Sequence, residues 1–224
     1  GNYSFTKNLS AFARVSDGVA FNADRILFGT PLDGSAPINI NTVKQIEGGV
    51  KWRSGGISTF VTLFQAKTDE SNYEATTQRS TSNKYDAKGV ELEVRWLASE
   101  HFSFTFSGNT QHTTVKGPDT SFQYVPVHTV GVTGANGFGG SYVVWSFDSV
   151  RPGDYDYTLI PKSVVSLYGA YASDQHDWGK LYGTMGVTHV TKTSGTVPGA
   201  VVYPAYAVVN GSLAYEYGPY TATL

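Results

Sequence analysis

The sequence predicts an all-β fold, an antiparallel up-and-down transmembrane β-barrel. Three observations support this prediction. Apolar and polar residues alternate with a period of two along much of the chain, and short turns alternate with long polar segments. The segments between them, such as 89–98 and 102–116, are long enough for the ~9–11 residues that a tilted strand needs to cross a bilayer.

The alternation predicts which side chains share a face of the sheet. In the segment 89–98, Val90, Leu92 and Val94 alternate with Glu91 and Glu93. A register shift of one residue would move the glutamates to the apolar face, so the pattern specifies the register. Because charge in lipid is costly, the apolar set should face lipid and the charged set the lumen. The predicted lipid-facing residues are Val90, Leu92, Val94, Phe102, Phe104 and Phe106, and the predicted lumen-facing residues are Glu91, Glu93, Arg95, Ser103 and Thr105.

The connections divide into two lengths, which predicts a barrel with two different ends. Gly, Pro, Ser, Thr, Asn and Asp mark both kinds of connection. We expect about ten sequentially paired strands, with every short turn at one end and every long loop at the other. An additional hairpin is expected near 137–140. The short turns are 6–8, 54–56, 99–101, 173–179 and 218–219, and the long loops are 17–42, 69–86, 116–160 and 192–206.

The composition narrows the function classes. Charged residues make up 15% of the 224 residues, below the roughly 25% of soluble domains. The net charge of -2 does not indicate a nucleic-acid partner. The absence of cysteine excludes disulfides and thiolate metal sites. No apolar run approaches the ~20 residues of a transmembrane helix, and no signal peptide opens the chain.

Motifs in family order carry a resemblance to a known group of proteins. The segment 45–53 reads QIEGGVKWR, 87–93 reads AKGVELE, and 160–162 reads IPK. Two further segments contribute to the resemblance. The segment 2–16 reads as a turn that leads into a strand, and the segment 206–215 reads YAVVNGSLAY. Together they resemble the C-terminal barrel half of TonB-dependent outer-membrane receptors, in the siderophore-receptor branch. The segment 87–93 is the most specific, whereas 206–215 has an asparagine where the family usually has aspartate.

The resemblance implies more than this chain contains. It implies a partial transmembrane β-barrel domain over 1–224, from a larger barrel of about 22 strands, with the plug domain and the final strand absent from the chain. We also expect more chain on both sides, because Leu224 follows closely on the turn at 218–219. The implied location is the bacterial outer membrane. The implied function is import of a scarce nutrient, a ferric siderophore or a similar small ligand, with outer-membrane lipid around the barrel and the TonB complex acting through the plug. No cofactor and no metal site are implied.

Aromatic residues and arginines in the long segments are the candidate ligand-binding residues. Aromatic rings in loops can stack on a flat ligand, and arginines can steer an anionic complex toward them. A second aromatic set lies near the short turns and suits an interfacial girdle, namely Trp52, Trp96, Tyr171, Trp178 and Tyr217. The candidate binding residues are Tyr73, Arg79, Tyr124, Tyr142, Trp145, Arg151, Tyr155 and Tyr157.

The sequence does not predict an enzyme. No nucleophile elbow and no helical histidine pair is present, and the charged residues of 89–98 are expected to have a structural or plug-facing role. Two alternatives stay open. One is a small closed outer-membrane barrel acting as an adhesin or enzyme, which should end in an aromatic residue. The other is a soluble β-rich binding module such as a lectin, which should run in Greek-key order.

Overall fold

A computed structural model describes residues 1–21, 40–74, 79–117, 121–126, 137–138, 141–142, 145–195 and 202–224. Side chains are described for the same residues except 20–21, 71–74, 79–82 and 121–150. All regular structure in these parts of the chain is β. None of the described segments is a helix with the length and apolarity needed to cross a membrane.

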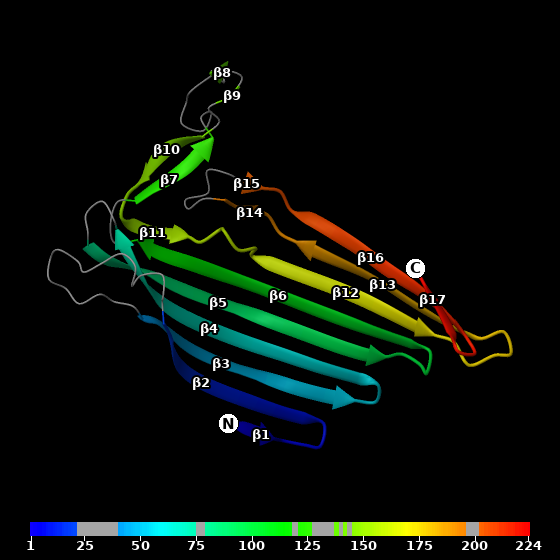
Figure 1. The fold of residues 1–224 in the computed structure, drawn as a ribbon. Coiled ribbons are helices and arrows are strands. Elements are labelled where there is room, and N and C mark those ends of the chain that lie inside the picture. The colour runs from blue at the N-terminus through cyan, green and yellow to red at the C-terminus, as the bar shows by residue number, and fades with distance from the viewer. Residues whose placement is uncertain are drawn as a thin grey trace.

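One antiparallel sheet of 11 strands dominates the molecule (Figure 1). Its strands follow chain order, and β11 pairs with β6 beside the main path. Three two-stranded ribbons complete the described structure. The main sheet consists of β1 (Asn2–Ser4), β2 (Leu9–Phe21), β3 (Ile40–Ser54), β4 (Ile57–Glu74), β5 (Arg79–Leu97), β6 (Phe102–Gly117), β11 (Gly153–Asp156), β12 (Ser163–Ala172), β13 (Lys180–Val190), β16 (Tyr206–Tyr217) and β17 (Tyr220–Thr223). The ribbons are β7 (Ser121–Pro126) with β10 (Trp145–Val150), β8 (Gly137–Phe138) with β9 (Ser141–Tyr142), and β14 (Thr193–Ser194) with β15 (Val202–Tyr203).

The predicted meander and its two ends are confirmed. The five predicted short turns join β1–β2, β3–β4, β5–β6, β12–β13 and β16–β17, and all lie at one end of the sheet (Figure 1). We call this the short-turn end and the opposite end the long-connection end. The hairpin expected near 137–140 is the ribbon of β8 and β9. The strands of the main sheet pair in sequence order, whereas the alternative of a soluble β-rich binding module requires Greek-key order.

The predicted lengths of the long loops are wrong, because strands continue into them. β4 runs to Glu74 and β5 begins at Arg79, so the described part of 69–86 is strand. β2 and β3 enter 17–42, and β11 and β14–β15 form in 116–160 and 192–206. Where both faces of a strand meet water, side chains on the two faces need not differ in polarity, so the alternation disappears. The backbone ladder continues there because it depends on N–H and C=O groups, not on hydrophobicity.

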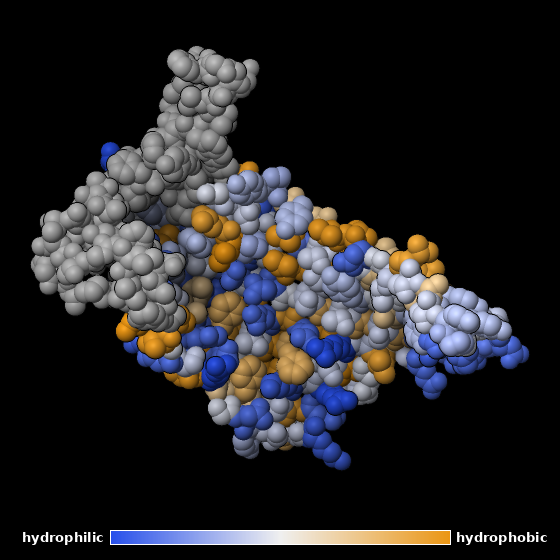
Figure 2. Space-filling view, in the orientation of Figure 1, coloured by the Kyte–Doolittle hydropathy of each residue, from blue (hydrophilic) through white to orange (hydrophobic). Residues whose placement is uncertain are grey.

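The predicted separation of side chains into two faces is confirmed by the register. Leu92 pairs with Gly108 and Val94 with Phe106, whereas Glu93 pairs with Ser107. We call the two sides the apolar face and the polar face. In the space-filling view, hydrophilic side chains gather across the middle of the visible face with a few hydrophobic ones between them (Figure 2).

The sheet has almost no apolar core of its own. Among the side chains that the structure describes, Val115 is the single buried apolar one. Large apolar side chains on the apolar face are open instead, with exposed fractions of 79% for Val15, 59% for Leu63 and 69% for Met185. A single sheet with this much exposed apolar surface requires another apolar phase to cover it, which a membrane supplies.

The structure places the five residues of the predicted aromatic girdle at the short-turn end. Trp52, Trp96, Tyr171 and Tyr217 lie near the short-turn ends of their strands, and Trp178 lies in the β12–β13 turn. The Trp178 ring stacks on His176 with a centroid distance of 4.8 Å. Rings of this kind anchor a barrel at the interface between lipid and water.

The polar face carries phenylalanines that the alternation did not predict. Phe12 pairs with Gly49, and Phe64 pairs with Gly89. Each ring lies over the glycine beside it, since a Cβ at Gly49 would approach the Phe12 ring to 2.7 Å and one at Gly89 the Phe64 ring to 2.8 Å. Rings that cover cross-strand glycines hold the register of a curved sheet.

We expect Gly89→Ala to destabilise the full-length protein by about 1–3 kcal/mol, because overpacking displaces neighbouring groups. The new Cβ would meet both the Phe64 ring and the backbone carbonyl of Thr110. Gly183→Ala is the matched control, because its new Cβ has only ordinary contact with Leu213 at 3.8 Å. Thermal unfolding followed by circular dichroism measures both. Equal melting temperatures for the two variants would contradict the close-packing role of Gly89.

Candidate ligand-binding site at the long-connection end

The sheet is interrupted between β11 and β12, although both strands pair with β6. The Tyr157 amide donates to the Thr113 carbonyl at 2.8 Å, and the Gln111 amide donates to the Lys162 carbonyl at 2.8 Å. Residues 158–161 therefore lie opposite His112 alone and leave the ladder as a bulge of four residues. Pro161 within the bulge has no N–H to contribute to a ladder.

The ribbon β14–β15 is tied to this bulge. The Ser194 amide donates to the Thr158 carbonyl at 2.7 Å, and the two hydroxyl oxygens lie 2.5 Å apart. Ser194 is buried at this junction. The bulge and the ribbon are thus fixed to each other by backbone and side-chain hydrogen bonds.

A pocket of about 890 Å³ lies between the bulge and the ribbon. Its size falls within the range of small-molecule sites, roughly 300–1,000 Å³. Its wall combines apolar surface with an aromatic side chain, two lysines and one aspartate. The residues concerned are Tyr155, Asp156, Ile160, Lys162, Lys192, Val202 and Pro204.

The charges around the pocket leave one cation without a partner. The Lys162 ammonium lies 3.4 Å from the Asp156 carboxylate, which neutralises it in part. Lys192 is exposed, and among the residues that the structure describes it forms no ion pair. The pocket therefore has a positive charge available for an anionic ligand.

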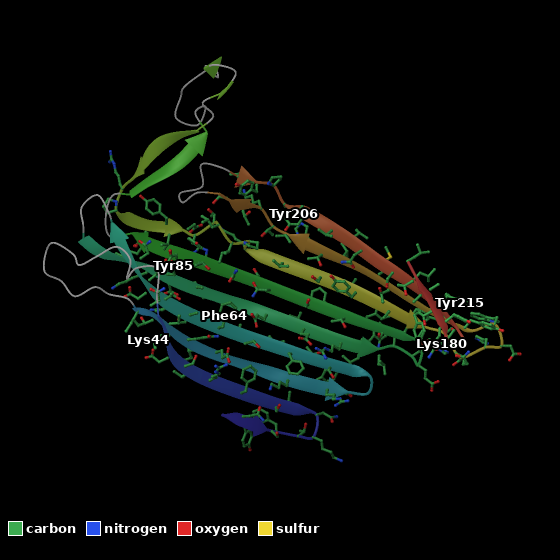
Figure 3. The ribbon with its side chains drawn as sticks, viewed as in Figure 1. Lys44, Phe64, Tyr85, Lys180, Tyr206 and Tyr215 are labelled. Atoms are coloured by element: carbon green, nitrogen blue, oxygen red, sulfur yellow. The ribbon has the colours of Figure 1, made fainter. Side chains whose placement is uncertain are left out.

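A tyrosine cluster adjoins the pocket through Tyr155 and Tyr157. The Tyr85 hydroxyl donates to the Glu70 carboxylate at 2.9 Å, and the Tyr85 and Tyr157 rings meet edge to face at 5.1 Å. Figure 3 shows Tyr85 at the long-connection end, far along the sheet from Tyr215. Burial, together with the nearby charge of Glu70, raises the pKa of Tyr157. The phenol is protonated at neutral pH, as that of tyrosine ordinarily is, and can donate a hydrogen bond.

The structure brings together three of the residues proposed from the sequence. Tyr155 lines the pocket, and its hydroxyl donates to the Arg151 carbonyl at 2.8 Å. Tyr157 belongs to the adjoining cluster, and Arg151 is exposed. For the other five, only the backbone is described, and their side chains lie outside the described residues. Tyr73 and Arg79 are at the tips of β4 and β5, and Tyr124, Tyr142 and Trp145 are in β7, β9 and β10.

Sequence reasoning missed several residues of this site. Glu70 and Tyr85 fell inside a segment taken as loop, although they are strand residues on the polar face. Lys192 and Ser194 belonged to the last long segment, which no pattern divided further. The segment 160–162 was noted only as the start of a strand, and the bulge before it had no signal beyond the proline.

Residues 1–224 match the protein family described as TonB dependent receptor-like, beta-barrel. This chain belongs to the TonB-dependent receptor β-barrel family. Members of this family lie in the bacterial outer membrane, so the apolar face of the sheet is the one that faces lipid. The family is one of transport receptors rather than of enzymes.

Three solved receptors share the fold of this TonB-dependent receptor chain. The ferric yersiniabactin uptake receptor FyuA of Yersinia pestis has a TM-score of 0.65 and 18% identity, and the match covers 96% of this chain and 28% of that one. The ferric-catecholate import receptor Fiu of E. coli K12 has a TM-score of 0.63 and 14% identity, and the match covers 97% of this chain and 28% of that one. FpvA of P. aeruginosa, solved with heterologous pyoverdines, has a TM-score of 0.65 and 14% identity, and the match covers 99% of this chain and 27% of that one.

The chain thus spans little more than a quarter of each of these receptors, and its sheet is a segment of a larger barrel wall. No curated protein is significantly similar to it in sequence. Among the described residues, no group of His, Cys, Asp and Glu is arranged to hold a metal ion.

Proposed function

We propose that the receptor to which this wall segment belongs imports a ferric siderophore across the outer membrane. The observation that carries the proposal is the pocket at the long-connection end, where Tyr155 and Lys192 combine aromatic surface with an unpaired cation. A ferric siderophore is bulky, partly flat and often anionic, which matches this combination. The solved receptors of the same fold are named for ferric yersiniabactin uptake and ferric-catecholate import, which supports the proposal.

Each part of the pocket has a separate role in the proposed capture. Lys192, together with Lys162, attracts the anionic complex from solution. Val202 and Pro204 offer apolar contact, and the Tyr155 ring adds rigid contact area at small entropic cost. The binding step requires no covalent chemistry from these residues, and we assign no enzymatic activity to the receptor.

We further propose that the rest of the receptor completes the transport path. The remaining wall, in a barrel of about 22 strands, would close the sheet, and a plug domain would fill its lumen. The polar face, with Glu91 and Glu93, suits contact with such a plug. The TonB complex would then supply energy through the plug.

The test is uptake of radiolabelled iron by iron-starved cells that carry the full-length receptor as their only receptor of this kind. We expect saturable uptake of at least one ferric siderophore from a panel of catecholate, hydroxamate and mixed chelates. Uptake of none of them, with intact receptor in the outer membrane, would contradict the proposal and direct the search to another cargo.

A second prediction concerns the candidate residues Tyr124, Tyr142 and Trp145. They lie within 121–150, and the described strands of this range pair outside the main sheet. We expect replacement of 121–150 by a short Gly-Ser linker to leave barrel assembly intact and to lower uptake about tenfold, because aromatic contact area is lost. Circular dichroism of the purified variant controls for the fold, and unchanged uptake would remove these three residues from the capture site.

A further inference from the structure

The wall of the pocket at the long-connection end contains an acidic residue besides its two lysines. Among the residues that the structure describes, the charged side chains that line the pocket are Asp156, Lys162 and Lys192. They lie at the end of β11, between the bulge and β12, and between β13 and β14, and these elements meet at the long-connection end (Figure 1). Two positive charges and one negative charge leave the pocket with a net charge of +1.

The Asp156 carboxylate is held from two sides. Its Oδ2 atom lies 3.4 Å from the Lys162 ammonium, and its Oδ1 atom lies 3.7 Å from Nε2 of His112. His112 is the β6 residue opposite the bulge, and its ring adds a charge only when it is protonated. Both carboxylate oxygens therefore contact a neighbour, which holds the negative charge in the wall of the pocket.

The bulge creates the contact between Asp156 and Lys162. Six residues of extended strand would separate them by about 20 Å, at about 3.3 Å per residue. Their partners on β6, Thr114 and Gln111, are however only three positions apart. Because the residues of the bulge leave the ladder, its two ends approach each other and the ammonium meets the carboxylate. The ion pair thus belongs to the same local geometry that forms the pocket.

This ion pair matters more for the charge of the pocket than for the stability of the fold. The side chains of Asp156 and Lys162 are 53% and 59% exposed, and ion pairs this open contribute little to stability. The potential of a carboxylate in the wall, by contrast, acts at short range on every charge of a bound ligand. Its effect on binding therefore grows with the charge of the ligand.

Lys192 is the cation that this arrangement leaves available to a ligand. It is exposed and forms no ion pair within the described parts of the chain. A ligand with one negative charge would neutralise it and leave the occupied pocket without net charge. Each further negative charge would lie near Asp156 with no cation to match it, and an unpaired charge that is shielded from water costs free energy.

We propose that Asp156 is a specificity-determining residue of the receptor. By holding the pocket at a net charge of +1, it selects ferric chelates with a single negative charge, such as a complex of two hydroxamates and one catecholate, over trianionic complexes of three catecholates. This inference rests on the proposed function for the class of ligand, whereas the charge of the pocket can be measured without any ligand.

The first test measures that charge with small quenchers of fluorescence. Purified full-length receptor, freed of any other cysteine, carries a label at A205C, because Ala205 lines the pocket and this chain has no cysteine of its own. Iodide, caesium and acrylamide serve as the anionic, the cationic and the neutral quencher. The variant D156N removes the negative charge and D156E keeps it. The matched control D177N makes the same change of net charge in the exposed β12–β13 turn.

We expect D156N to raise iodide quenching about threefold and to lower caesium quenching about threefold, as for charges several ångströms apart in water. Acrylamide quenching should not change, since a neutral quencher reports access alone, and D156E and D177N should match the wild type. Unchanged iodide quenching in D156N, or an equal increase in D177N, would overturn the proposal. An equal change for acrylamide and iodide in D156N would also overturn it, because Asp156 would then only maintain the shape of the bulge.

The second test measures the selection itself, with unlabelled receptor and ferric complexes of three hydroxamates, of two hydroxamates and one catecholate, and of three catecholates. The wild type should bind the monoanionic complex more tightly than the trianionic one. D156N should leave the affinity for the neutral complex unchanged, raise that for the monoanionic complex about threefold and raise that for the trianionic complex about thirtyfold, because the change in potential acts on each charge.

Two results would overturn the charge selection: tighter binding of the trianionic complex than of the monoanionic one by the wild type, or an equal effect of D156N on all three complexes. Binding of none of the three by the wild type would contradict the proposed cargo. In that case the quenching ratios would still decide whether Asp156 sets the charge of the pocket.

Discussion

Leu92→Arg is expected to lower the stability of the inserted barrel by about 2–4 kcal/mol and to reduce the amount of folded receptor in the outer membrane. Leu92 lies on the apolar face near the middle of β5, opposite Val61 and Gly108. A guanidinium there has no water and no acidic partner on its face. Unfolding of the receptor in urea, in lipid vesicles, measures the change.

Ser107→Arg is the control for this variant. Ser107 is exposed on the polar face of β6, opposite Glu93, so the same charge would enter a hydrated and acidic surface. We expect no loss of stability, and the nearby carboxylate favours the new cation. If Ser107→Arg destabilised the receptor as much as Leu92→Arg, the assignment of the two faces would be wrong.

Lys192→Glu is expected to raise the Kd for an anionic ferric siderophore at least tenfold. A hydrogen bond to a charged group contributes about 1.5–3 kcal/mol, and charge reversal replaces that attraction with repulsion. Binding to whole cells carrying the full-length receptor measures the Kd. Lys7→Glu makes the same change of net charge in an exposed turn at the short-turn end. Equal Kd values for Lys192→Glu and the wild type would remove this pocket from the capture step, and an equal effect of Lys7→Glu would reduce the role of Lys192 to net charge.

Much of the barrel wall could be predicted because the membrane imposes a pattern on the chain. Where lipid lies on one side and water on the other, residues such as Val90 to Arg95 must alternate, and the register confirms the faces they were assigned to. The short turns were equally visible, because Gly, Pro and Ser interrupt the alternation sharply. The polar-face rings of Phe12 and Phe64 broke the pattern, since they cover glycines instead of facing lipid.

The site was harder to predict because it lies beyond the membrane. There, both faces of β4 and β5 are hydrated. The neighbours of Glu70 and Tyr85 therefore show no apolar–polar alternation that would identify these two as strand residues. The pocket depends on a bulge opposite His112 and on hydrogen bonds between Thr158 and Ser194, which are 36 positions apart. Contacts of that kind come from the tertiary arrangement and produce no periodic pattern in the sequence. Tyr155 and Tyr157 were named as candidates on aromatic type alone, and the structure places them at and beside the pocket.

The central claim is that ligand capture occurs in the pocket between the bulge and the ribbon, and a fluorophore placed there tests it most directly. The chain has no cysteine, so Ala205→Cys, which lines the pocket, can carry a single label in a full-length receptor freed of any other cysteine. Gln175→Cys, in the exposed β12–β13 turn, places the same label at the short-turn end. We predict saturable quenching of the Ala205 label when intact cells bind a ferric siderophore, and no quenching of the Gln175 label. Binding of the ferric siderophore without any change at Ala205 would contradict the claim.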